Sequence, residues 1–305
     1  MPDAFIIRRA RPEDREAMER ICAHTWDDGD YIPYVWDRWL VDGEGPLEVG
    51  EIEGRVVALS KITFFTPGEA WLQGMRVDPD YRQRGIGSRF LEHNLEYARD
   101  HGARVARLST SIRNTPVHAM MVRAGMERIG TYVLWQADAL PDGPQPLILS
   151  AGDQAAVEAF LRTSPVLDFC HGVYGAEWAW QDLSPEEVAS LLQAGRIAAP
   201  AAPAGPLPAL AVLSEDREDR AIDTGFADGD PAAVRDLAMA LRGHAARLGA
   251  AWTRAWLPEV DWLRDAFASV GYAFGEWHGE MCLYERAFSP SPQEPALSGA
   301  NGRAG

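Results

Sequence analysis

The stretch from residue 69 to residue 87, EAWLQGMRVDPDYRQRGIG, constrains the fold of this chain more than any other. It begins as an apolar-rich strand pattern, passes the turn signal Asp78-Pro79-Asp80, and reaches a loop with glycines at 85 and 87; a helical pattern follows from 88 to 101. The first N–H groups of a helix have no intrahelical acceptor, and the helix dipole favours negative charge beside them. Glycines let the backbone approach an anion that a Cβ would hold away. The stretch therefore predicts a pyrophosphate-binding loop.

The loop lacks two better-known phosphate-binding motifs. It has no G-x-G-x-x-G pattern of the dinucleotide-binding folds, and no Gly-Lys-Ser/Thr follows it as in a Walker loop. The pattern Arg82-x-x-Gly85-x-Gly87, with the run RVDPDYR at 76–82 leading into it, resembles instead the acyl-CoA pyrophosphate loop of the GNAT acetyltransferases. Because the motif is short, it also fits an ordinary strand–turn–helix with two turn glycines.

A second GNAT signature, N-x-x-A-x-x-L-Y-x-x-x-G-F, is recognisable further along the chain. Asn114 and Gly125 match it, and Val117, Met120 and Met126 keep its hydrophobic register. The predicted element order between residues 4 and 138, β-α-β-β-β-α-β-α-β, is also the GNAT order. The resemblance implies an α/β (α+β) GNAT fold, in which helices flank a mixed central sheet.

The second half of the chain repeats this pattern in a weaker form. A strand ending near residue 226 is followed by the run ADGDP at 227–231, a helix at 232–248, a buried strand at 251–257 and a terminal strand at 281–286. Two aspartates stand where phosphates would lie and would repel them, so we expect a degenerate GNAT-like unit without a second active site. The predicted divisions are a catalytic domain at 1–140, a linker at 141–149, the degenerate domain at 150–288 and a disordered tail at 289–305.

The resemblance implies acetyl-CoA as co-substrate and assigns most of its contacts to the main chain. The fourth strand would splay from the fifth, so that its free N–H groups hold the pantetheine arm and polarise the thioester carbonyl. The loop N–H groups would hold the pyrophosphate between two flanking arginines, and Asn114 would contact the pantetheine arm or hold the loop. The implied cofactor-binding residues are Met75, Arg76, Val77, Arg82, Gln83, Arg84, Gly85, Ile86, Gly87, Ser88 and Asn114.

The proton-transfer groups are harder to assign, because the positions where the family often carries a glutamate hold Gln73 and Trp71. Gln73 can orient a water molecule or the amine but cannot accept a proton. The candidate catalytic residues are Gln73, Met75 through its backbone, and Glu69, which shares a strand face with Gln73 and could act as base through water. His118, Asp30 and a relay of bulk water remain alternatives for the base.

The usual acid of the family is a tyrosine, and the matching residue here is Met121. Methionine cannot donate a proton, so Tyr132 or Tyr81 would have to replace it, or the coenzyme A thiolate would leave without an acid. This departure keeps open a non-enzymatic alternative, in which the chain is an acyl-CoA binder or sensor.

An aromatic segment at 26–40, WDDGDYIPYVWDRWL, indicates either core packing or the wall of an acceptor pocket. Together with the strand LQGMRV at 72–77, it resembles the histidine N-acetyltransferase-like branch of the superfamily. That resemblance implies a free amino acid or similar small amine as acceptor, with Asp30, Tyr31, Tyr34 and Trp71 as substrate-contacting residues. Acetylation of a protein N-terminus or lysine is the remaining alternative.

Composition narrows the partners and the compartment. The net charge is −16, from 29 basic and 45 acidic residues, which argues against nucleic-acid binding. Three widely spaced cysteines without a CxxC motif fit reduced thiols, and no metal is expected. The sequence shows no signal-peptide pattern and no apolar run of transmembrane length, so we expect a cytoplasmic protein without membrane contact. The tandem units predict a monomer, as an internal pseudo-dimer, or a homodimer.

Overall fold

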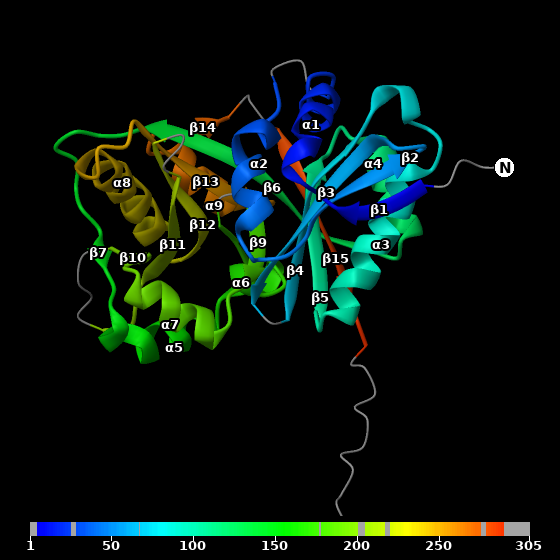
Figure 1. Cartoon of the computed structure of the whole chain (residues 1–305). Coiled ribbons are helices and arrows are strands. Elements are labelled where there is room, and N and C mark those ends of the chain that lie inside the picture. Colours follow the sequence, from blue (N-terminus) through cyan, green and yellow to red (C-terminus); the bar gives the residue numbers. More distant parts are fainter. Residues whose placement is uncertain are drawn as a thin grey trace, which may run out of the picture.

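The computed structural model describes residues 5–25, 29–66, 68–176, 178–200, 205–216, 220–275 and 279–289. The disorder predicted for the tail concerns residues that lie, from 290 onward, outside the described part of the chain. Figure 1 shows one continuous, twisted sheet that runs through both halves, with helices on its two faces. The predicted mixed α/β sheet is confirmed.

The first half follows the predicted alternation of strands and helices. Its strands are β1 (Phe5–Arg9), β2 (Leu47–Ile52), β3 (Arg55–Thr66), β4 (Glu69–Val77), β5 (Val105–Ser111) and β6 (Glu127–Asp138). Its helices are α1 (Arg15–Cys22), α2 (Ile32–Val41), α3 (Ile86–Asp100) and α4 (Thr115–Arg123). Strands β1, β2, β3 and β4 pair in that order, and each pair is antiparallel, while β4 and β5 run parallel. A parallel neighbour requires a crossover connection, and α3 provides it.

The second half repeats the plan with an added hairpin. Its strands are β7 (Leu147–Ile148), β8 (Val173–Ala176), β9 (Ala179–Asp182), β10 (Ile197–Ala199), β11 (Ala209–Asp216), β12 (Ala221–Gly229), β13 (Trp252–Pro258), β14 (Ala273–Phe274) and β15 (Glu280–Ala287). Its helices are α5 (Gln154–Leu161), α6 (Pro165–Phe169), α7 (Pro185–Gln193), α8 (Pro231–Arg247) and α9 (Asp261–Ala268). Strands β8 and β9 form a separate two-stranded sheet.

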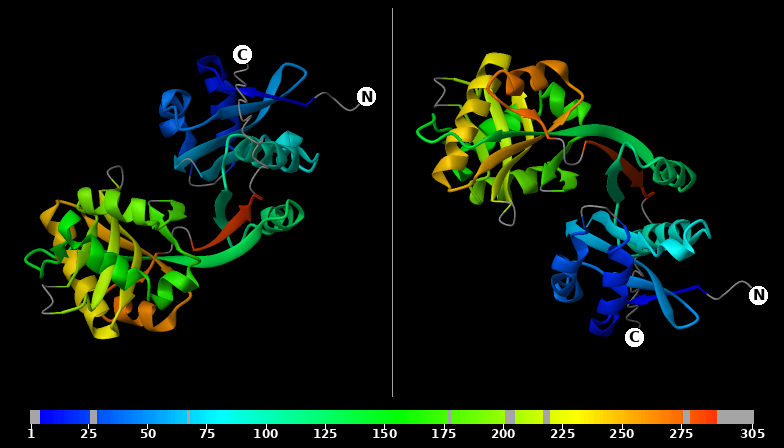
Figure 2. Two further views of the ribbon diagram at one scale, coloured as in Figure 1. Left: turned by 90° about the horizontal axis from the view of Figure 1, so that it is seen from below. Right: turned by 90° about the horizontal axis from the view of Figure 1, so that it is seen from above.

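Two strands are exchanged between the halves. The last strand of the chain, β15, lies between β5 and β6, where Tyr284 pairs with Leu108 on one side and Met281 pairs with Tyr132 on the other. The opposite edge of β6 pairs with β13, so that Trp135 lies beside Ala255. Figure 2 shows β6 passing from one lobe to the other, with β15 beside it. Each lobe is therefore completed by a strand from the other half of the sequence.

The hydrophobic core continues across this junction. The largest cluster of buried residues lies mainly in the second half but includes Trp71 and Tyr132 from the first. Amphipathic spacing explains the helix positions: α3 buries Ile86, Phe90 and Leu95 against the sheet and leaves its other face to solvent. None of the helices in the described ranges is long and apolar enough to cross a membrane.

Candidate functional site

Strand β4 separates from β5 partway along its length. Only Glu69, Ala70 and Trp71 pair with β5, and the rest of β4 runs free on that side. The cause is a bulge on the other side, where the register with β3 shifts between Gln73 and Arg76. Gly74 adopts φ +64° in this bulge, a left-handed conformation that favours glycine. The splay predicted for the fourth strand is confirmed, and it leaves residues 72–77 of β4 without a strand partner on the β5 side.

Tight packing also requires a glycine at this bulge. A Cβ on Gly74 would lie 2.8 Å from the side chain of Trp39, which projects from α2. Trp39 is buried, and Tyr31 meets its ring edge-on with 5.9 Å between ring centroids. The aromatic segment therefore supports the bulge from behind as part of the core.

The loop after β4 presents a run of free N–H donors. Within the described chain, no hydrogen bond uses the N–H of any residue from 83 to 88 as donor, while Arg89 N–H already bonds to Gly85 O at 3.0 Å. Gly85 is the N-cap of α3 at φ +77°, and Gln83 also has a positive φ, +62°. Successive N–H groups at a helix start form an anion-binding concavity. The arrangement suits a pyrophosphate, and the assigned cofactor contacts at these positions stay a prediction.

Two arginines flank this run of donors. Arg82 donates to Val77 O at 3.3 Å, and Arg84 donates to Asp80 O at 3.1 Å. Both side chains are exposed, and the Arg84 guanidinium lies 4.9 Å from the centre of the Tyr81 ring. On the inner side, a Cβ on Gly87 would lie 3.5 Å from Met120 Sδ of α4. The loop is therefore positively charged at its rim, and Met120 lies beside Gly87 at its base.

A buried ion pair ties the start of α2 to the bulge. Arg76 donates to both oxygens of Asp30, at 2.7 and 3.1 Å, and also to Met75 O at 3.1 Å. The Asp30 side chain is 1% exposed and accepts in addition from Ile32 N–H. Burial alone would lower the pKa of Arg76, but its hydrogen bonds to Asp30 outweigh that effect and raise the pKa. The Arg76 guanidinium therefore stays charged.

The ion pair with Arg76 changes the role expected for Asp30. Asp30 was a candidate base and substrate contact, but its carboxylate is held by Arg76 and by the α2 backbone, which gives it a structural role. The nearby Cys22 is also unreactive, because burial raises the pKa of its thiol to about 12 and the Asp30 charge adds to the effect. Of the other predicted substrate contacts, Tyr31 is half exposed and Tyr34 is 85% exposed on α2. Tyr34 therefore points to solvent.

Glu69 is not placed as a base either. Its carboxylate accepts from Arg107 Nη1 at 2.8 Å and from the backbone N–H of Asp182 at 2.8 Å, and the residue is 4% exposed. Arg107 also donates to Asp182 and Glu285, at 2.5 and 2.6 Å, which brings β4, β5, β9 and β15 together. The expectation that Glu69 relays a proton through water is replaced by a structural role in this network.

The predicted contacts at Trp71 and Gln73 have different environments. Trp71 is 4% exposed and packs against Trp180 of β9, with 6.0 Å between ring centroids, so it is covered and does not form an open wall. Gln73 is half-buried and donates to Thr63 Oγ1 at 2.8 Å. It therefore stays beside the bulge as a group that could orient an amine or water.

Residues of α4 take mainly structural positions. Asn114 is the N-cap residue and donates from its side chain to Thr110 Oγ1 at 3.2 Å. His118 bonds to Tyr284 and to Ile112 O through its two ring nitrogens, so neither nitrogen is free. Met121, at the position of the family's tyrosine, is 1% exposed within the core. Tyr132, proposed as an alternative acid, is 2% exposed, and burial raises its pKa well above the usual value.

Sequence reasoning did not identify the residues that pack around β4. The bulge at Gly74 could have been predicted, because a glycine inside a strand pattern often marks a bulge. Trp39 and Trp180 carried no comparable signal, since a tryptophan in an apolar pattern fits core packing equally well.

Comparison with known proteins agrees with this geometry. Residues 11–126 match the family model described as acetyltransferase (GNAT) family. A GCN5-related N-acetyltransferase from Sphaerobacter thermophilus aligns over 94% of this chain and 96% of its own, at 15% identity and a TM-score of 0.63. A tandem GNAT protein from the clavulanic acid biosynthesis pathway aligns over 94% and 99%, at 16% identity and a TM-score of 0.54.

A third solved structure is a GCN5-related glucosamine N-acetyltransferase region of a fungal multi-domain β-N-acetylglucosaminidase. It aligns over 94% of this chain and 38% of its own, at 14% identity and a TM-score of 0.59. A comparison with curated proteins found no significant match. At 14–16% identity, these three structures show a shared fold alone. Over residues 11–126 the chain matches the GNAT acetyltransferase family, and over 94% of its length it shares the fold of a tandem GNAT protein.

Proposed function

We propose that this protein transfers an acetyl group from acetyl-CoA to the amine of a small molecule such as an amino acid. One observation carries the proposal: the run of free N–H groups at 83–88 lies directly after a strand that a bulge has separated from its neighbour. The loop donors would bind the pyrophosphate, and the backbone of Met75, Arg76 and Val77 would bind the pantetheine and the thioester carbonyl.

The chemistry requires three things of the protein: a positioned thioester, a donor for the carbonyl oxygen and a route for the amine proton. The amine attacks the thioester carbon, a C–N bond forms, and the C–S bond breaks to release the coenzyme A thiolate. The backbone N–H groups beside Gly74 would stabilise the negative charge that develops on the carbonyl oxygen.

The proton route in this proposal uses water. The carboxylates of Glu69 and Asp30 are bound by Arg107 and Arg76, respectively. Gln73 can hold a water molecule that carries the ammonium proton to solvent, and the thiolate can take its proton from solvent as well. A transferase that relies on such a relay should speed up with rising pH as more of the acceptor amine becomes unprotonated.

A small acceptor fits better than a polypeptide because the acceptor face of β4 is partly covered. The β8–β9 hairpin lies on it, where Trp180 packs against Trp71 and Asp182 meets Arg107. An extended peptide laid along this face would have to displace the hairpin. The glucosamine N-acetyltransferase neighbour adds amino sugars to the acceptor classes that deserve testing.

The test begins with binding of acetyl-CoA, measured as a thermal shift. Wild type should be stabilised, and Gly85→Glu should abolish the shift because a carboxylate would stand among the loop donors. Gly54→Glu is a matched control, since Gly54 and Gly85 have φ of +80° and +77° and both have open space where a side chain would go. No shift with wild type would reject the cofactor.

The second measurement follows thiol release across amino acids, amino sugars, other amines and peptides. The proposal predicts release well above hydrolysis with at least one small amine and little with peptides. Binding of acetyl-CoA without release by any amine would instead favour the sensor alternative, and release with peptides alone would favour protein acetylation.

A further inference from the structure

The second half of the chain repeats the strand–loop–helix unit that holds the pyrophosphate loop in the first. Strand β12 pairs in parallel with β13 only from Ala221 to Thr224, and its remaining residues to Gly229 run free on that side. Helix α8 begins directly afterwards at Pro231. The position at the end of β12 therefore corresponds to the position at the end of β4.

The start of α8 offers no free donors to an anion. Pro231, the first helical residue, has no N–H, and the Asp230 carboxylate accepts from the N–H groups of Ala232 and Ala233. Val234 N–H bonds to Asp230 O at 2.8 Å. The first turn is thus fully capped, whereas the first turn of α3 is open. This agrees with the expectation that the run ADGDP excludes phosphate.

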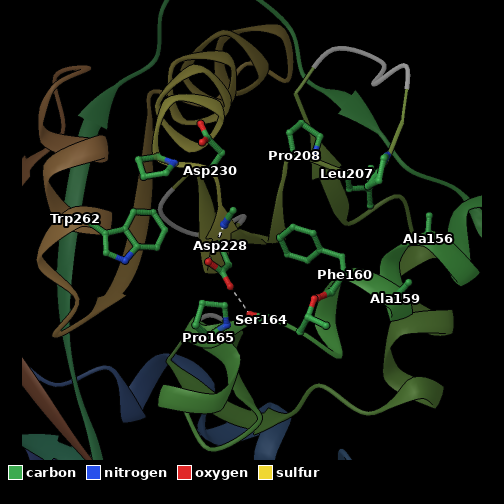
Figure 3. Close-up of a pocket in the computed structure, with 14 residues that line it drawn as sticks. Ala156, Ala159, Phe160, Ser164, Pro165, Leu207, Pro208, Asp228, Asp230 and Trp262 are labelled. Carbon is green, nitrogen blue, oxygen red and sulfur yellow. Dashed lines mark hydrogen bonds between the residues drawn. The ribbon is translucent and has the colours of Figure 1, made fainter.

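A pocket of about 780 Å³ nevertheless lies at this position, within the size range of small-molecule sites. Figure 3 shows Trp262 on one side of it and Phe160 on the opposite side, with Asp228 between them. Leu207 and Pro208 add further apolar surface. The pocket is therefore mainly apolar and aromatic along its walls.

The charge of the pocket is negative. Asp228 is 2% exposed, and its carboxylate is held by the Ser164 hydroxyl, by Val166 N–H at 3.3 Å and by Gly229 N–H at 2.7 Å. Asp230 adds a second carboxylate on the exposed side. Among the described residues that line the pocket, no lysine, arginine or histidine offsets these charges. Neutral dipoles orient Asp228 without cancelling its charge, and the partly apolar surroundings weaken solvent screening.

We propose that this pocket binds an organic ammonium ion with an apolar body. The carboxylates would attract the cationic group, Trp262 would contact it or the adjoining carbons through its ring face, and Phe160 would cover the apolar part. Anionic ligands, including coenzyme A, are rejected by the same carboxylates. The second unit has thus kept the location of a ligand site while changing the ligand's charge. This inference is independent of the acetyl transfer proposed above.

The test uses benzyltrimethylammonium, a quaternary ion that cannot be acetylated, titrated into the full chain by calorimetry. Benzyl alcohol and benzoate serve as neutral and anionic counterparts of similar size. We expect saturable binding of the cation, at least tenfold weaker binding of the alcohol, and no binding of benzoate. Raising the salt concentration should weaken binding of the cation alone.

Variants locate the site. Trp262→Leu should weaken cation binding at least tenfold, and Asp230→Ser should weaken it several-fold while the serine preserves the helix cap. Gly85→Glu, which blocks the loop of the first half, should leave cation binding unchanged. Circular dichroism melting checks that each variant is folded, and Asp230→Ser keeps the test decisive if Trp262→Leu is unstable.

Three outcomes would overturn the proposal. They are an absence of saturable binding up to about 10 mM cation, equal affinity for benzyl alcohol, and affinity that is unchanged in both Trp262→Leu and Asp230→Ser. Loss of cation binding in Gly85→Glu would also reject the assignment, because it would place the amine in the first half of the chain.

Discussion

The ring of Trp39 closes over the backbone of Gly74, so that a Cβ at position 74 would lie 2.8 Å from the indole. The same glycine adopts φ +64°, and the bulge that it forms separates β4 from β5. One contact between α2 and β4 therefore links the aromatic segment to the geometry of the proposed thioester site.

Replacing Gly74 with alanine should disturb both stability and the site. The left-handed φ costs an alanine on the order of 1–3 kcal/mol, and the clash with Trp39 adds to it. We expect a lower denaturation midpoint in urea and weaker acetyl-CoA binding. Gly54→Ala is the control, because φ is +80° there and no atom lies within 4 Å of the new methyl group. Equal destabilisation of the two variants would show that the Trp39 contact contributes nothing.

The buried ion pair between Asp30 and Arg76 should contribute more to the free energy of unfolding than a surface ion pair does. Asp30→Asn removes the charge that Asp30 places against a buried guanidinium, for which the expected loss of stability is about 3–5 kcal/mol. Arg76→Lys keeps the charge but loses the planar guanidinium that donates to both oxygens of Asp30 and to Met75 O. If the pair positions the bulge, Arg76→Lys lowers kcat more than it raises KM for acetyl-CoA. A change confined to melting temperature would leave the pair with a purely structural role.

Much of the first half could be predicted from the sequence because its signals are local. The loop after residue 78 and the helix at 86–100 follow from glycine positions and apolar spacing, and the capped start of α8 follows from the run ADGDP. These features depend on a few neighbouring residues. The loop at Gly85 and the helix cap at Asp230 can therefore be predicted from the neighbouring residues alone.

The features that sequence could not supply depend on residues far apart in the chain. Nothing near Glu69 indicates that Arg107 and the backbone of residue 182 bind its carboxylate, since residue 182 is 113 positions away. The place of β15 between β5 and β6 is equally non-local, because the pattern of residues 280–287 predicts a strand without its partners. The pairing of the Glu69 and Asp30 carboxylates could not be predicted for this reason, because the local sequence is the same whether a carboxylate is free or paired.

Trp180 should hold the two lobes together. Its ring lies 6.0 Å from Trp71, 5.1 Å from Tyr132 and 5.3 Å from Trp256, measured between ring centroids. Trp180→Ala should cost about 3–5 kcal/mol of unfolding free energy, and Trp180→Phe much less. Hydrogen exchange should show faster opening in both β4 and β13. Exchange that accelerates in β13 alone would contradict a role in joining the lobes.

His93 gives the stability a defined pH dependence. Its hydrogen bond to Glu48, 2.8 Å long, raises the pKa of His93 above 6.5 in the folded protein, while partial burial opposes the rise. A raised folded-state pKa means that this contribution is fully present below about pH 6.5 and is lost as the pH rises through the folded value. The difference in unfolding free energy between wild type and His93→Gln should therefore be larger at pH 6 than at pH 8.5. The variant His24→Gln, at an exposed histidine, corrects for the loss of a histidine as such. A difference that is constant across this range, or that grows with pH, would show that the Glu48 contact does not favour the charged imidazole.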